Sequence, residues 1–155
     1  MSSTETEPIQ DTLERYEKFV NDRLKIDLKD TLDLRDQVYE KMSEYLKLRS
    51  QVETLKENNV KEMKSMVDLG SNFYAQAKIP DTTYIYLNVG YGFHVQLTLQ
   101  EALDFIEKKE KNLQKVADQY TTEASKIKAH IKMVLEAIAE VLQIEQQEAQ
   151  IRREL

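Results

Sequence analysis

The chain has 155 residues, of which 32% are charged, and its formal net charge at pH 7 is −6. It contains no cysteine, which excludes disulfide and thiol chemistry, and its acidic balance argues against general nucleic-acid binding, which needs clustered Lys and Arg. Only three Gly and two Pro interrupt the chain, too few for a compact bundle of short helices. No apolar run approaches the roughly 20 residues of a membrane span, and the acidic start "MSSTETEPIQ" lacks a signal-peptide core, so we expect an intracellular protein.

The first predicted helix covers residues 8–62. Pro8 suits the first helical turn, and no Gly or Pro follows before Gly70. Apolar residues recur in steps of three or four, but several steps of four follow one another, so the apolar stripe should drift around the helix. At about 1.5 Å per residue the helix would be roughly 80 Å long, and its stripe needs a partner helix along most of that length. The stripe begins with Ile9, Leu13, Tyr16, Val20, Leu24, Leu28 and Leu32.

The second predicted helix covers residues 99–150 and can continue to the end of the chain. The sequence "TLQE" at 98–101 is a capping box, in which Thr98 accepts from the Glu101 N–H while the Glu101 side chain reaches back to the Thr98 N–H. Apolar residues then recur as heptads over five to six repeats, which predicts the seam of an antiparallel coiled coil with the first helix. The predicted seam residues are Ile106, Leu113, Tyr120, Ile127, Ile131, Val134, Ile138 and Val141.

Between the helices, residues 66–98 have the alternating pattern of β-strands. Gly90-Tyr91-Gly92 separates two alternating runs and Gly70-Ser71 separates an earlier pair, which predicts two successive β-hairpins. Two hairpins with one apolar face are too small to be stable alone, and their free edges invite pairing with other chains. We therefore predict an oligomerisation surface. Its residues form either a local core or a core shared between chains, and they are Phe73, Ile79, Ile85, Leu87, Val89, Phe93, Val95 and Leu97.

A second candidate surface lies at the tip where the two chain ends would meet. Partly exposed apolar side chains there could hold non-native client proteins by burying apolar area, at about 25 cal/mol per Å². The alternative is that these residues merely continue the coiled-coil seam. The candidate client-binding residues are Ile9, Leu13, Tyr16, Leu142, Ile144 and Ile151.

No catalytic or metal site is predicted. His94 and His130 are the only histidines, and neither has a neighbouring Cys or the spacing of metal ligands. No P-loop, G-x-S-x-G or H-E-x-x-H motif is present. We therefore expect no enzyme activity, no cofactor and no metal, and any action of the chain on other proteins would depend on binding energy alone, without ATP.

The stretch "AKIPDTTYIYLNVGYGFHVQLTLQEALDFI", residues 77–106, resembles the prefoldin subunits of the α class. The A-x-I-x-D-T turn, the G-x-G-[FY] hairpin tip and the capped start of the second helix stand in the family order. The stretches "RYEKFVNDRLKIDLKDTLDLRDQVYEKMSEYLKLR", "MVDLGSNFY" and "KAHIKMVLEAI" are similar to one branch of that class. The resemblance implies a mainly α fold with a small β part, in which a long antiparallel coiled coil of two helices is joined by two β-hairpins in one domain, residues 1–155.

The resemblance also implies partners and a function. Members of this family assemble as a hetero-hexamer of two α-class and four β-class prefoldin subunits, which holds non-native client proteins on its coiled-coil tips. The branch implies a prefoldin-like complex that associates with a co-chaperone assembly containing AAA+ ATPases, in the cytoplasm and also in the nucleus and at the centrosome. A second reading is a coiled-coil scaffold or transcription cofactor that binds specific partners without general client holding. Neither reading involves nucleic acid or a membrane, and the unpaired hairpin edges predict a homo-oligomer when the chain is isolated.

Overall fold

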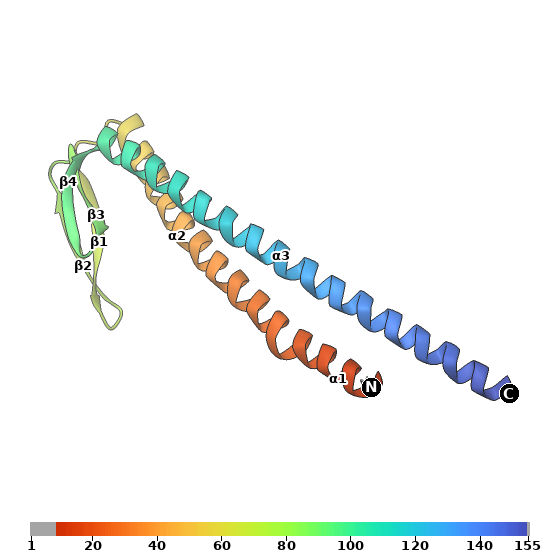
Figure 1. Cartoon of the computed structure of the whole chain (residues 1–155). Coiled ribbons are helices and arrows are strands. Elements are labelled where there is room, and N and C mark those ends of the chain that lie inside the picture. The colour runs from red at the N-terminus through yellow and green to blue at the C-terminus, as the bar shows by residue number, and fades with distance from the viewer. Residues whose placement is uncertain (1–8, 155) are drawn as a thin grey trace. The chain divides into compact units, whose positions relative to one another are not determined.

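The computed structural model describes residues 9–154, in the order helix, two hairpins, helix (Figure 1). The predicted fold class is confirmed, because the chain is mainly helical and its two long helical stretches are joined by two separate antiparallel hairpins. Pro8 lies outside the described residues. The elements are α1 (Ile9–Phe19), the π-helical turn η1 (Val20–Leu24), α2 (Lys25–Glu57), β1 (Met63–Gly70), β2 (Phe73–Ile79), β3 (Tyr84–Gly90), β4 (Phe93–Thr98) and α3 (Leu99–Glu154).

The chain divides into two compact units. The hairpin unit, residues 38–115, contains α2 from Val38 to its end, both hairpins and the beginning of α3. The helix unit consists of the residues up to Gln37 and those from Val116 onward, and therefore of α1, η1, the beginning of α2 and the rest of α3. Each unit has its own buried apolar core. The core residues are Val52, Leu87, Ala102 and Ile106 in the hairpin unit, and Val20, Leu24, Ala117, Ala124 and Ile138 in the helix unit.

The predicted drift of the first apolar stripe has a local cause. From Leu28 to Val52 the covered positions follow steps of three and four in alternation, as in a heptad repeat. Two steps of four precede them, from Val20 to Leu24 and from Leu24 to Leu28, so this segment holds one residue more than the heptad needs. The π-helical turn absorbs that residue, since the Lys25 N–H donates to the Val20 carbonyl five residues back. The prediction of an uninterrupted α-helix was wrong at this turn.

The predicted end of the first helix at residue 62 was also wrong. Helix α2 ends at Glu57, and Asn59 follows with a φ of 47°, in the left-handed region that Asn tolerates. The Val60 N–H donates to the Leu55 carbonyl at 3.2 Å, which is the hydrogen bond of a Schellman motif. Strand β1 can therefore begin at Met63, earlier than we predicted.

The capping box at the start of α3 is confirmed. The Thr98 N–H donates to Glu101 Oε2 at 2.9 Å, and the Glu101 N–H donates to Thr98 Oγ1 at 3.3 Å. The backbone N–H of Thr98, followed by its hydroxyl, holds the pKa of Glu101 below its ordinary value. These bonds satisfy N–H groups that would otherwise have no helical partner, so α3 begins directly after β4.

Candidate functional site

The two hairpins turn in the same way. Asp68 Oδ1 accepts a hydrogen bond from the Gly70 N–H at 2.7 Å, and Asn88 Oδ1 accepts one from the Gly90 N–H at 2.9 Å. In both turns the glycine and the two residues after it have positive φ, and the strand register shifts at that glycine. Each feature of the second turn lies twenty residues after its equivalent in the first. The hairpins are therefore equivalent modules, and a residue of one can be compared with the residue twenty positions away in the other.

Each hairpin has one apolar face, as the alternating sequence predicts. The pairing of β1 with β2 and of β3 with β4 brings the odd-numbered residues of both strands to the same face. In the first hairpin this face consists of Met63, Ser65, Val67, Leu69, Phe73, Ala75, Ala77 and Ile79. In the second it consists of Ile85, Leu87, Val89, Phe93, Val95 and Leu97.

The apolar face of the β3–β4 hairpin packs against helices of its own unit. Leu87 is only 4% exposed, and Ile85, Val89 and Leu97 are half-buried. Beside them is a groove of about 460 Å³, lined by Leu87 and Val89 of β3 together with Tyr45 and Leu48 of α2 and Lys109 of α3. This hairpin has therefore already buried much of its apolar face within the chain.

The apolar face of the β1–β2 hairpin is open at its turn end, whereas Met63, Ser65, Ala75 and Ala77, farther from the turn, are half-buried. Val67 is 47% exposed, Leu69 68% and Phe73 72%. Ala75 and Ala77 on the same face have small side chains, so the surface next to these exposed residues is shallow. An open apolar face with two free strand edges is the arrangement that binds another chain.

The eight predicted oligomerisation residues thus fall into two groups. Phe73, Ile79, Phe93 and Val95 are exposed, whereas Ile85, Leu87, Val89 and Leu97 are buried or half-buried. Leu87 belongs to the local core of the hairpin unit, which is one of the two roles predicted for this set. Sequence reasoning also missed Val67 and Leu69 as candidates, although the twenty-residue repeat relates them to Leu87 and Val89.

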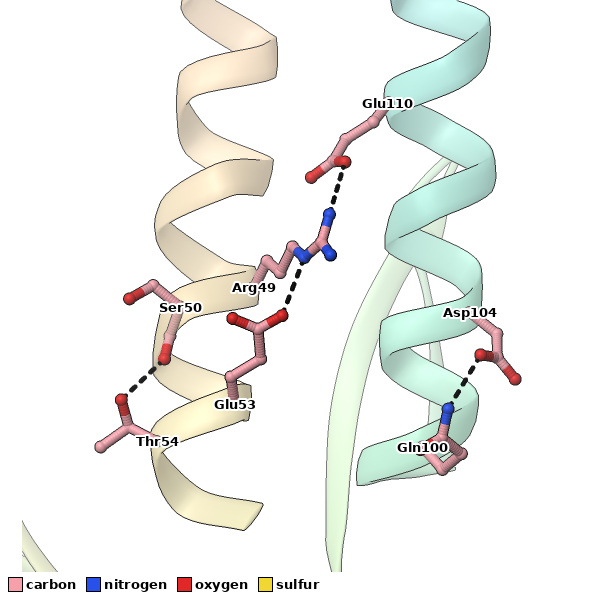
Figure 2. Close-up of polar contacts among 7 residues, drawn as sticks. All are labelled: Arg49, Ser50, Glu53, Thr54, Gln100, Asp104 and Glu110. Carbon is pink, nitrogen blue, oxygen red and sulfur yellow. Dashed lines mark hydrogen bonds and ion pairs between the residues drawn. The ribbon is translucent and has the colours of Figure 1, made fainter. Parts of the chain in front are cut away.

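A polar contact joins α2 and α3 in the hairpin unit (Figure 2). Arg49 donates to Glu53 of its own helix at 2.9 Å and to Glu110 of α3 at 3.2 Å. The hydrogen bond to Glu53, followed by the charge of Glu110, raises the pKa of Arg49. Near the end of α2, Thr82 Oγ1 donates to the Val60 carbonyl and ties the connection between the hairpins to the helix end. An ion pair between α2 and α3 therefore holds together the helices that support the β3–β4 hairpin, and a hydrogen bond fixes the end of α2.

The predicted seam residues all lie on the covered side of α3. Ile106 and Ile138 are buried, and the other six are half-buried. Of the predicted client-binding residues, Leu13 is half-buried, and the side chain of Ile9 lies outside the described part of the chain. The exposed members of that set are Tyr16, Leu142, Ile144 and Ile151.

Charge is distributed unequally between the units. Residues 38–115 contain eleven Lys and Arg and eleven Asp and Glu, so the hairpin unit is neutral. The remaining eleven Lys and Arg and seventeen Asp and Glu lie in residues 1–37 and 116–155, which therefore carry the whole net charge of −6. A surface of the helix unit attracts basic ligands more readily than acidic ones.

Neither a metal centre nor a membrane segment emerges from residues 9–154. Among them, no group of three or more His, Asp or Glu side chains is placed to hold a metal ion. Their helices likewise include none that is both long and apolar enough to cross a membrane.

Comparison with known proteins identifies the class. The model of the family "Prefoldin subunit" matches residues 24–144, and the chain belongs to this family. It is 47% identical to Protein UXT of Bos taurus and 46% identical to Protein UXT of Homo sapiens, in each case over 127 residues that cover 82% of this chain and 81% of that protein. It is 42% identical to the Protein UXT homolog of Nematostella vectensis over 135 residues, 86% of this chain and 85% of that protein. The predicted family and the predicted UXT-like branch are confirmed.

A solved structure shows the same fold. The filamentous PFD from Methanocaldococcus jannaschii, determined by cryo-EM, superposes with a TM-score of 0.60. The match covers 74% of this chain and 93% of that chain, at 16% sequence identity. At this identity the likeness supports the architecture of helices and hairpins alone.

Proposed function

We propose that this chain is a noncatalytic α-class subunit of a prefoldin-like co-chaperone complex. It assembles through its hairpins with β-class subunits and a second α-class subunit, and its helix unit holds non-native or partly assembled clients without ATP. Family membership and the two antiparallel hairpins support this proposal. The two units act together as one prefoldin-like domain. The complex works in the cytoplasm, the nucleus and the centrosome, together with a co-chaperone assembly that contains AAA+ ATPases.

The open face of the β1–β2 hairpin is the observation that carries the assembly part of the proposal. A solitary two-stranded hairpin is marginally stable in water, and this one also exposes Val67, Leu69 and Phe73. Strands from another chain would pair with its free edges and cover these side chains in one step. The gain is about 25 cal/mol per Å² of apolar area removed from water.

Two neighbouring aromatic residues provide a matched test. Phe73 and Tyr74 are 72% and 54% exposed, but alternation along β2 puts them on opposite faces of the hairpin. We expect Phe73→Asp to prevent hexamer formation on co-expression with β-class subunits, and Tyr74→Asp to leave it intact. Native mass spectrometry measures the assembly, and circular dichroism checks that both variants keep the helix content of the parent. Hexamers of unchanged stoichiometry from Phe73→Asp would refute assembly through this face.

Client holding needs its own measurement. The assembled complex should suppress the aggregation of a chemically unfolded substrate in the absence of ATP, followed by light scattering. We expect removal of residues 142–155 to weaken suppression, because this segment contains the exposed Leu142, Ile144 and Ile151. Native mass spectrometry of the truncated complex separates this effect from loss of assembly. A complex that never suppresses aggregation but binds one partner stoichiometrically would be a scaffold.

A further inference from the structure

Within the helix unit, α3 carries a second apolar stripe beside its seam. Met133, Ala137, Ile144 and Ile151 follow one side of the helix in steps of four and seven residues. Met133 is 65% exposed, Ile144 52% and Ile151 58%, while Ala137 is half-buried. One partner helix covers one seam, so this stripe has no partner among the described residues of the unit.

The stripe begins at a groove between α1 and α3. Val134 lines this groove together with Thr12, Arg15, Tyr16 and Phe19 of α1. Met133 precedes Val134 on α3, and Ala137 lies one turn after it. Tyr16 and Phe19 are themselves partly exposed, so the groove adds apolar surface close to the residue at which the stripe begins.

The spacing of the stripe indicates the conformation of its ligand. Residues that repeat every seven positions on one helix fit the knobs of a second helix, since both rise about 1.5 Å per residue. An extended chain rises about 3.3 Å per residue and alternates its side chains every two residues, so it does not keep step with such a stripe. The stripe therefore fits an amphipathic helix.

The surrounding charges indicate the composition of that helix. Glu140 lies within the stripe, between Ala137 and Ile144, and Glu136, beside it, pairs with Lys132 at 3.7 Å. The whole helix unit has an excess of six acidic residues. A second copy of this chain would bring an equally acidic helix unit, whose repulsion disfavours it as the occupant. Lys and Arg beside the apolar positions of the ligand would meet the acidic side chains favourably.

We propose that the surface formed by Met133, Ala137, Ile144 and Ile151 binds an amphipathic α-helix of another protein, with Lys or Arg on the flanks of its apolar stripe. The inference rests on the proposed function, because it names the chemistry of what the helix unit holds. It also restricts the ligand, since an unfolded chain with no helical tendency would bind this surface poorly.

Three synthetic peptides test the conformation and the charge of the ligand. The first carries a Leu and Ile heptad with Lys flanks, the second has the same heptad with Glu flanks, and the third is the Lys peptide with a central Pro. Fluorescence anisotropy with the full chain measures binding at low and high salt. We expect the first peptide to bind at least about tenfold more tightly than either of the others. Salt should weaken its binding, because part of the attraction is between exposed charges.

Two sets of variants locate the site. Replacing Met133, Ile144 and Ile151 together by Gln should weaken binding of the Lys peptide about tenfold or more, because three exposed apolar contacts are lost. The matched control replaces Ile26 and Leu34 by Gln, since these α2 side chains are 50% and 45% exposed in the same unit but lie outside the stripe. We expect this control to bind like the parent.

Glu140→Gln tests the electrostatic part separately, because Glu140 lies within the stripe whereas Glu136 already pairs with Lys132. This variant should reduce the preference for the Lys peptide over the Glu peptide, while the apolar stripe stays intact. Circular dichroism on every variant verifies that α3 remains helical.

The outcomes separate this inference from the proposed function. Equal binding of all three peptides, or unchanged binding by the triple Gln variant, would overturn the inference. If the complex still suppressed aggregation in that case, the proposed function would stand without it. A complex that binds the Lys peptide as expected but never suppresses aggregation would keep the helix-binding surface and lose the proposed client holding.

Discussion

The two hairpins share a turn and a register but differ in burial at two pairs of equivalent positions next to the turn, where Val67 and Leu69 are exposed, Leu87 is buried and Val89 is half-buried. At equivalent positions the β3–β4 hairpin has Ile85, Val95 and Leu97, whereas the β1–β2 hairpin has Ser65, Ala75 and Ala77. At these three pairs the larger side chain is no better covered, since Ser65 and Ile85, and Ala77 and Leu97, are all half-buried and Val95 is more exposed than Ala75. Val67 and Leu69 are instead exposed where Leu87 and Val89 are covered, although the side chains are similar in size, so the difference lies in the helices available to each hairpin.

The largest expected effect separates the two hairpins at one pair of equivalent positions. Leu87→Asp puts a charge into the core of the hairpin unit and should lower the free energy of unfolding by about 3–5 kcal/mol. Val67→Asp, at the equivalent position of the first hairpin, changes a half-exposed side chain. It should change the free energy of unfolding by no more than about 0.5 kcal/mol. Urea unfolding of the isolated chain measures both. Similar losses from the two substitutions would show that the β1–β2 hairpin is also covered within the chain.

The same two substitutions should also affect assembly, but for different reasons. Leu87→Asp should also abolish assembly, but by disrupting the hairpin unit itself, so it does not isolate a contact between chains. Val67→Asp should abolish assembly while the isolated chain keeps its stability. A stable Val67→Asp variant that still forms hexamers would contradict the assembly role of the open face.

The turns provide a smaller effect. Gly90 has a φ of 119°, and no atom lies within 4 Å of the place where a Cβ would stand, so Gly90→Ala tests backbone strain alone. We expect it to cost about 1–2 kcal/mol. Gly92→Asn should be nearly neutral, because Asn72 occupies the equivalent position with a φ of 63°. Thermal unfolding compares the variants, and a large loss from Gly92→Asn would mean that the two turns are not interchangeable.

A weaker, local effect is expected at Arg49, which bonds to Glu110 across the helices that support the β3–β4 hairpin. Arg49→Ala should speed amide hydrogen exchange in β3 and β4 more than in β1 and β2. Lys111→Ala is the control, because it removes an exposed pair with Glu107 inside one helix. Equal acceleration in both hairpins would show that the Arg49 contact supports the whole unit.

The smallest effect is the pH dependence of the β4–α3 junction. The pKa of Glu101 is lowered in the folded chain, so its contribution to stability is fully present above its ordinary value near 4.5. That contribution should be lost as the pH falls below this value and through the lowered pKa. The connection after the β1–β2 hairpin has a carboxylate of its own, Asp81, whose pKa is lowered by hydrogen bonds from the hydroxyl and then the N–H of Thr83. Glu101→Gln should therefore remove the acid response of amide exchange at β4 and leave the response next to Asp81 unchanged. An acid response at β4 that persists in this variant would have another cause.

Much of the fold could be predicted from local signals. The capping residues Thr98 and Glu101 locate the start of α3, and alternating side chains locate both hairpins. The end of α2 was missed because Asn59 is a weaker signal for left-handed backbone than Gly. The π-helical turn was missed because successive steps of four can be spread along a coiled coil as well as absorbed in one turn.

The candidate surfaces could be predicted only in part. Alternation identifies an apolar face in each hairpin, but it does not tell whether that face meets the chain's own helices or another chain. Leu87 and Val67 have similar surroundings in the sequence and opposite environments in the structure. Which of them is covered depends on contacts between β3 and α2, which lie far apart along the chain.

The π-helical turn Val20–Leu24 also affects which deletions the gene can tolerate. It is a place where the gene can lose one codon and leave the protein's heptad more regular than before, since the surplus residue sits within this single turn. The same loss between Leu28 and Val52 would turn every later side chain of the helix by about 100° and move its seam away from α3. Small in-frame deletions should therefore survive selection at this turn far more often than in the regular heptads that follow it.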